Sequence, residues 1–186
     1  MQNTTLNRAL IRGISAGVAA LALLACTPKL DWREVHGSDA PYTALLPAKP
    51  ASFSRQIDLH GIKMTMNMVA AEVDGTTFAV GSAKLPDSAQ ALAALEGMKE
   101  GMLKNINGRI TSEKTGAAST ATTNGSKQSR SYDVEARGNL QNGQAVVLAA
   151  RFVASEQWVY QAVIMGNEKM VTRDTIDTFM TSFKTR

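Results

Sequence analysis

The sequence predicts an α+β domain in which two helices cover an antiparallel β-sheet. Three observations support this class. Residues 62–70 alternate apolar and polar side chains, as a half-buried strand does. Residues 92–106 carry apolar side chains at spacings of three and four, which is typical of one helix face. Residues 109–165 then hold several extended runs separated by turn signals, which indicates a strand meander before a second helix.

The first part of the domain is predicted to form antiparallel strands. Their ranges are 42–46, 53–59, 62–70 and 76–85. His60-Gly61 is expected to be a turn. Asp74-Gly75 is a hairpin turn signal, because Asp-Gly tolerates the positive φ of a tight turn.

The first helix is predicted to begin after Asp87, whose side chain can cap free backbone N–H groups, with Gln90 three residues on. Asn107-Gly108 is the predicted stop, because glycine accepts the left-handed conformation there. Gly97 and Gly101 each cost about 1 kcal/mol relative to alanine inside a helix, which indicates a close approach to the sheet. The expected apolar stripe is Leu92, Leu95, Met98, Met102 and Ile106.

The second half is predicted to be the meander and the closing helix. Strands are expected at 129–137, 145–154 and 158–165, and the last two are the most apolar and therefore central. Thr115–Gly125 is either a thin edge strand or a loop, and Asn124-Gly125 is a turn signal. Asn167 is expected to cap the helix. Its core face is Ile176, Phe179, Met180 and Phe183.

The N-terminal segment has the parts of a secretory signal. Arg8 and Arg12 precede an apolar stretch at 14–25, which is too short to span a bilayer of about 30 Å. The run Leu23-Leu24-Ala25-Cys26 resembles the lipobox of bacterial lipoproteins. That resemblance implies that residues 1–25 are a signal peptide and that Cys26 carries the lipid. An ordinary cleaved signal with an incidental cysteine, or an uncleaved anchor, are the alternatives.

The resemblance also bears on location and organisation. Lipoproteins with Asp after the cysteine stay in the inner membrane; Thr27 here implies the outer membrane, facing the periplasm. Residues 26–40 are expected to be a tether in which Trp32 and Val35 pack against the fold, and residues 41–186 a single domain.

Charge and cysteine content exclude some classes. Removing Arg8 and Arg12 with the signal leaves 18 basic residues of the original 20, against 16 acidic ones. The basic residues are scattered, so no nucleic-acid partner is expected. A single cysteine excludes an internal disulfide.

Several segments together resemble the PsbP-like fold. They are 42–47 (Tyr-Thr-Ala-Leu-Leu-Pro), the long helix after the first strands, and the closing 179–184. Members include an extrinsic subunit of photosystem II, a Ran-binding nuclear import factor and bacterial exported lipoproteins. Residues 31–35 and 46–50 are also similar to a group of uncharacterised proteobacterial lipoproteins. The resemblance implies a non-enzymatic binding or assembly module, and it brings no catalytic residues.

The candidate chemistry is sparse. His36 and His60 are expected to be exposed, and no metal or cofactor is expected. Two acidic pairs, Asp133 with Glu135 and Asp174 with Asp177, are expected to be solvated. Five methionines are expected to pack as ordinary core, with an apolar ligand or soft copper as the alternative. They are Met64, Met66 and Met68 on a strand face and Met98 and Met102 on a helix face.

These observations predict a membrane-anchored periplasmic lipoprotein that acts as a non-enzymatic accessory or binding module of the cell envelope. Its expected partners are membrane lipid, through acylated Cys26, and an unknown envelope protein. The alternative is a carrier of a small apolar ligand held between the methionine strand and the first helix. An enzyme is the least favoured class.

Overall fold

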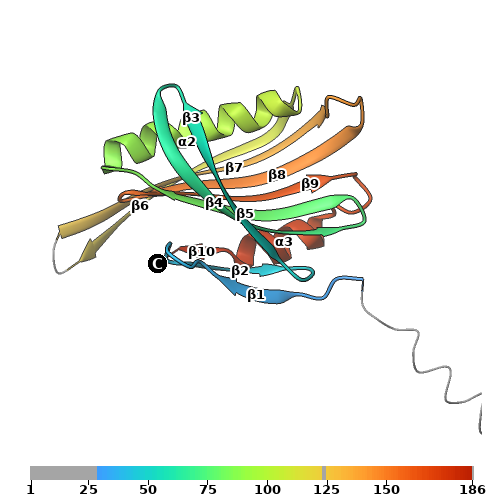
Figure 1. Cartoon of the computed structure of the whole chain (residues 1–186), viewed down its shortest axis with the longest axis horizontal. Helices are drawn as coiled ribbons and strands as arrows, with labels where there is room; N and C mark the ends of the chain where they lie inside the picture. The colour runs from blue at the N-terminus through green and yellow to red at the C-terminus, as the bar shows by residue number, and fades with distance from the viewer. Residues whose placement is uncertain (1–28, 123–124, 186) are drawn as a thin grey trace, which may run out of the picture.

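A seven-stranded antiparallel sheet forms the centre of the fold (Figure 1). The computed structural model describes residues 29–122 and 125–185. The strand order is β3-β4-β5-β9-β8-β7-β6, so β9 is the middle strand, as the sequence predicted. The strands are β3 (Ala51–Leu59), β4 (Ile62–Val73), β5 (Thr76–Lys84), β6 (Arg109–Thr122), β7 (Gly125–Asn139), β8 (Ala145–Ser155) and β9 (Trp158–Gly166).

The two predicted hairpin turns are confirmed. His60 and Gly61 have φ values of 56° and 87°, and Asp74 and Gly75 have 48° and 70°. Two successive residues with positive φ match the right-handed twist of the flanking strands. These turns connect β3 to β4 and β4 to β5.

A second, three-stranded sheet packs below the first. It consists of β1 (Arg33–His36), β2 (Tyr42–Leu46) and β10 (Lys184–Thr185), with β2 in the middle. Part of the expected tether is therefore a strand. The Trp32 ring meets the edge of the Phe78 ring at a centroid distance of 5.9 Å, so the predicted packing of Trp32 is confirmed.

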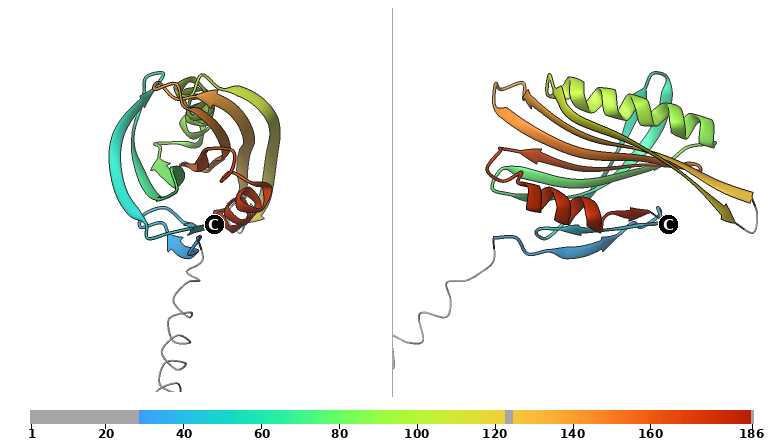
Figure 2. Two further views of the ribbon diagram at one scale, coloured as in Figure 1. Left: turned by 90° about the vertical axis from the view of Figure 1, so that its right-hand side faces the viewer. Right: turned by 180° about the vertical axis from the view of Figure 1, so that it is seen from behind.

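The two helices lie on opposite faces of the large sheet (Figure 2). Helix α2 (Ser88–Asn105) begins as predicted: the Asp87 carboxylate accepts the N–H of Gln90 at 2.8 Å. Its end differs in one detail. Asn107, and not Gly108, takes the left-handed conformation, with φ 46°. Asparagine adopts this region more readily than other residues with a side chain.

The buried face of α2 is shifted from the predicted stripe. Leu95, Met98 and Ile106 are buried as expected, whereas 40% of Leu92 is exposed. Ala91 and Ala94 are fully buried. The helix therefore rests on its small residues, which bring its axis closer to the sheet, and Leu92 lies on the flank.

The predicted cap of the last helix is wrong. Helix α3 (Arg173–Ser182) begins after Thr172, whose hydroxyl accepts the N–H of Thr175 at 3.3 Å. The Asn167 side chain instead accepts the N–H groups of Lys169 and Met170, which closes a turn before the helix. The predicted core face of α3 is confirmed, since all four of its residues are buried.

Two separate cores result from this arrangement. The core beneath α2 contains aliphatic and methionine side chains together with Tyr132 and Phe152. The core between the two sheets and α3 is aromatic. Tyr160 makes edge contacts with Tyr42 and Phe183, and Phe78 with Phe179, at centroid distances of 5.8–6.2 Å.

The β6–β7 hairpin extends beyond the rest of the sheet (Figure 1). Thr115 to Thr122 continue β6, and Gly125 begins β7, so this segment is an edge strand rather than a loop. Asn124, in the predicted turn, lies outside the described residues. A β-bulge between Ile110 and Ser112 shifts the pairing of β6 with β7.

The two helical glycines give a matched test of this packing. A Cβ at Gly101 would meet nothing within 4 Å, whereas a Cβ at Gly97 would lie 3.2 Å from the Leu59 Cβ. Gly101→Ala should raise the free energy of unfolding by about 0.5–1 kcal/mol, because alanine costs less backbone entropy in a helix. Gly97→Ala should give a smaller gain or a loss. Urea denaturation of both variants measures this, and equal gains would contradict the close approach at Gly97.

Candidate functional site

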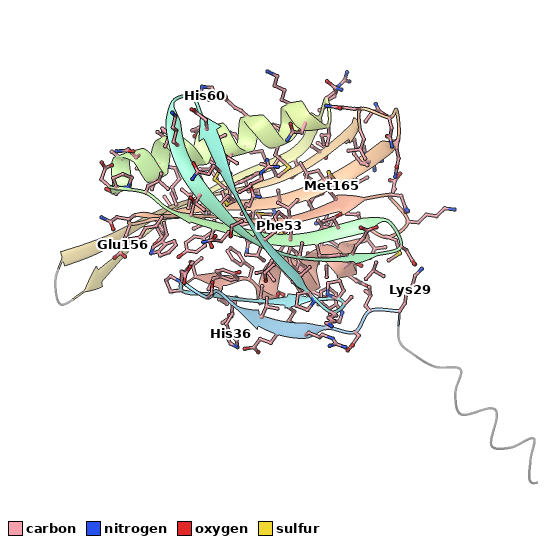
Figure 3. All side chains as sticks on the ribbon, viewed as in Figure 1. Lys29, His36, Phe53, His60, Glu156 and Met165 are labelled. Atoms are coloured by element: carbon pink, nitrogen blue, oxygen red, sulfur yellow. The ribbon has the colours of Figure 1, made fainter. Side chains whose placement is uncertain are left out.

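The sequence-predicted lipidation residue, Cys26, lies outside the described residues. The described chain begins at Lys29, whose ammonium is 2.6 Å from the Asp74 carboxylate in the β4–β5 turn. The N–H of Asp31 then donates to the Pro47 carbonyl at 2.8 Å. The chain thus enters the fold at one end of the sheet. Glu156, in the β8–β9 turn, lies at the opposite end (Figure 3).

The methionines occupy the core beneath α2. Met64, Met66 and Met98 are buried, and Met68 and Met102 are partly buried against the same cluster. A Cβ at Gly81 would collide with the sulfur of Met68 and crowd that of Met66. The two thioethers therefore fill the space above the sheet at this point.

The histidines lie apart on the surface. His36 Nε2 is 3.1 Å from the Glu34 carboxylate, and His60 Nε2 is 3.8 Å from that of Glu100. Across residues 29–122 and 125–185, no three His, Cys, Asp or Glu side chains converge as metal ligands would. Neither helix of the described chain is long and apolar enough to cross a membrane.

A charged face lies on β7 and its neighbours, on the side of the sheet that carries α3. Tyr132, Val134 and Ala136 point into the core beneath α2. The alternation of a strand therefore turns Asp133, Glu135 and Arg137 to the opposite side. Each of these three residues is opposed by partners on β6 and β8. The cross-strand rows are Lys114–Asp133–Arg151, Ser112–Glu135–Ala149 and Arg109–Arg137–Val147.

Two of the three β7 charges sit in bidentate ion pairs. The Arg151 guanidinium donates to Asp133 at 2.6 and 2.7 Å and to the Met180 carbonyl at 2.9 Å. The Asp133 hydrogen bond raises the pKa of Arg151. Arg173, at the start of α3, donates to Glu135 at 2.8 and 3.0 Å, which raises the pKa of Arg173. These pairs join α3 to the sheet where the apolar core ends.

In the third cross-strand row, Arg109–Arg137–Val147, the positive charges are not balanced by bidentate ion pairs. Arg109 and Arg137 lie directly opposite each other on β6 and β7. Like charges in this position repel, which destabilises the pairing. Arg137 is 2.5 Å from Glu168, and this hydrogen bond lowers the pKa of the Glu168 carboxyl. Within the described chain, neither Arg109 nor Lys169 has an acidic partner at salt-bridge distance.

These residues line an open cleft of about 1080 Å³. Its charged lining residues are Arg109, Arg137, Lys169 and Glu168, three cations and one carboxylate. The Asn167 amide also lines it. The Asn167 side-chain oxygen accepts the N–H groups of Lys169 and Met170, which leaves the NH₂ group of this lining residue as a donor. The arrangement suits an anion.

Tight backbone packing fixes one wall of the cleft. The N–H of Asn139 donates to the Ile106 carbonyl at 2.6 Å, which ties the end of β7 to the turn after α2. A Cβ at Gly138 would overlap the same carbonyl oxygen. Glycine is therefore needed for the close approach of these two backbones.

A second polar cluster holds α2 against β6 and β7. The Tyr132 hydroxyl donates to Glu96, which raises the pKa of the phenol and lowers that of the carboxyl. The Lys99 ammonium bonds Glu113 at 2.9 Å and lies 4.3 Å from the centre of the Tyr132 ring. Burial lowers the pKa of Lys99, but its acidic partners outweigh burial and raise it. We interpret this cluster as structural.

The fold is similar to that of a solved protein. The solution structure of the cyanobacterial PsbP (CyanoP) from Synechocystis sp. PCC 6803 superimposes with a TM-score of 0.51 and 10% sequence identity. The similarity covers 87% of this chain and 96% of the other. The domain has a PsbP-like fold. No protein-family model matches the chain, and no curated protein matches its sequence.

Sequence reasoning missed most of this site. It placed Asp133 and Glu135 on one face, which is confirmed, but expected both to be solvated. Both are instead paired with arginines from β8 and α3. Alternation reveals which residues share a face, whereas the pairing of β7 with β8, which aligns Asp133 with Arg151, joins residues 18 apart.

Removing the most enclosed arginine tests the structural role of this face. Arg151→Ala should lower the free energy of unfolding by about 1–3 kcal/mol, because it leaves the Asp133 carboxylate and the Met180 carbonyl without donors. Arg173→Ala is the matched control. Its side chain is 62% exposed, so the loss should be much smaller than that of Arg151→Ala. Equal losses of unfolding free energy for the two variants in urea denaturation would contradict the structural role of Arg151.

Proposed function

We propose that this protein is a lipid-anchored lipoprotein of the bacterial cell envelope and a non-enzymatic accessory or binding module there. The observation that carries the anchor is the position of the lone cysteine. Cys26 ends an apolar segment and stands only three residues before Lys29, where the described domain begins. A lipid on this cysteine would hold the domain directly beside the membrane.

The domain itself supports a binding role by analogy. The sequence resemblance to the PsbP-like fold implies a binding or assembly module, and an argument from fold is one of analogy. The long β6–β7 hairpin projects at the end of the sheet away from Lys29 (Figures 1 and 3). The bilayer would not obstruct an envelope protein that binds at this end. Crosslinking in intact cells identifies such a partner.

The outer membrane, facing the periplasm, is the proposed location, since the residue after the cysteine is Thr27 rather than Asp. The sequence-based alternative, a carrier of a small apolar ligand, stays a prediction. Mass spectrometry of lipids extracted from the purified protein tests it directly.

Replacing the anchor residue tests the proposal. Cys26→Ser should leave the domain folded but release it from membranes, because two or more acyl chains are needed for stable attachment. Fractionation after a salt and carbonate wash measures the release. Intact mass of the wild-type protein from a native host should show acyl chains and a chain that begins at Cys26. A free thiol, or wild-type membrane retention of the serine variant, would contradict lipid anchoring.

A further inference from the structure

The basic cleft and the entry of the chain lie at the same end of the large sheet. Asp74, the partner of Lys29, is in the turn that precedes β5. The strand pairings show which residues of the other strands lie at this same end. Thr77 is opposite Met165, and Val147 is opposite both Gly166 and Arg137. The cleft residues therefore lie on strand ends at the same end of the sheet as the β4–β5 turn. Three strand spacings put Arg137 about 15 Å from this turn.

The length of the linking chain sets how far this end can stand from a lipid on Cys26. Only Thr27 and Pro28 separate Cys26 from Lys29. Three residue steps span at most about 11 Å, even when fully extended. An acylated Cys26 would therefore direct this end of the sheet toward the bilayer. The Debye length at physiological salt is about 8 Å, so charges at this end would act on the lipid headgroups when the linking chain is not fully extended.

The charges of the cleft complement an anionic headgroup. Glu168 is paired with Arg137, and Glu135, two residues from Arg137 on the same face of β7, is paired with Arg173, so both of these carboxylates are already engaged. Arg109 and Lys169 remain without acidic partners in the described chain. A phosphate between Arg109 and Arg137 would relieve their cross-strand repulsion, because guanidinium groups donate bidentate hydrogen bonds to phosphate.

We infer that this cleft binds the phosphate-bearing headgroup of an anionic phospholipid in the membrane that holds the anchor. The inference rests on the proposed function, since the anchor orients the cleft. Arg109, Arg137 and Lys169 supply the charge, and the Asn167 amide supplies a further donor. The cleft volume of about 1080 Å³ accommodates a headgroup with its glycerol. Headgroup binding sets the orientation of the domain on the membrane, with the β6–β7 hairpin directed away.

The test uses the Cys26→Ser chain, so that binding does not depend on acylation. Binding is measured by flotation with vesicles of phosphatidylcholine alone and of phosphatidylcholine with phosphatidylglycerol, at low and high salt. Phosphatidylcholine vesicles report any binding through the apolar N-terminal segment. Arg8 and Arg12 of that segment also attract anionic lipid, but they are common to the parent and both variants, so the comparison between the variants isolates the cleft. The cleft variant is Arg109→Gln with Lys169→Gln. The matched control, Arg55→Gln with Lys63→Gln, removes one arginine and one lysine from exposed positions of β3 and β4.

The cleft variant should lose about tenfold or more of its preference for phosphatidylglycerol, because each cation at a membrane surface contributes roughly fivefold in affinity. The control variant should keep the preference, and high salt should weaken it. Equal losses in the two variants, or no preference in the parent chain, would overturn the inference. So would inorganic phosphate that competes at low concentration, since the site would then belong to a free anion. Acylation is measured separately by intact mass. The proposal of a lipid anchor on Cys26 and the inference of headgroup binding in the cleft can therefore be contradicted independently.

Discussion

The fold depends on the burial of strand β9 on both faces. All but two of its nine residues are buried. One face contacts the core beneath α2 through Val159 and Val163, and the other contacts the aromatic core through Tyr160, Ala162 and Ile164. Apolar burial on both faces is the main source of free energy that fixes a central strand. It also explains why the chain needs two layers, one on each side, to complete the structure.

On the strands farther from β9, fewer apolar side chains are buried, and polar contacts replace apolar ones. Tyr132, Val134 and Ala136 of β7 are buried on the α2 side, whereas Asp133, Glu135 and Arg137 on its other side are not buried. On its other side α3 covers the sheet incompletely, and the arginine–carboxylate pairs of Asp133 and Glu135 occupy the margin. Beyond the start of α3, the row of Arg109 and Arg137 has Glu168 as its carboxylate, which pairs with Arg137 and leaves Arg109 without an acidic partner in the described chain. The candidate anion cleft is thus a direct consequence of where the covering helix begins.

This geometry gives the domain two different ends. One end combines the entry of the chain, the Lys29–Asp74 pair and the basic cleft. The other end holds the β8–β9 turn and the projecting β6–β7 hairpin. A lipid anchor on Cys26 would assign these ends to the membrane and to the periplasm. The proposed function and the inferred headgroup site are therefore two parts of one orientation.

The sequence by itself determined the class of the fold, the order of most elements and the two hairpin turns. Period-two and period-3.6 patterns and turn residues are local signals, and they suffice for this. Tertiary structure decided which helix covers which face, that Arg33–His36 pairs with β2, and that Ala91 rather than Leu92 faces the core. It also decided the charged face, because Arg109, Asp133 and Arg151 are far apart in the chain. Their proximity follows from strand order and register, which depend on the burial of the whole sheet rather than on any local pattern.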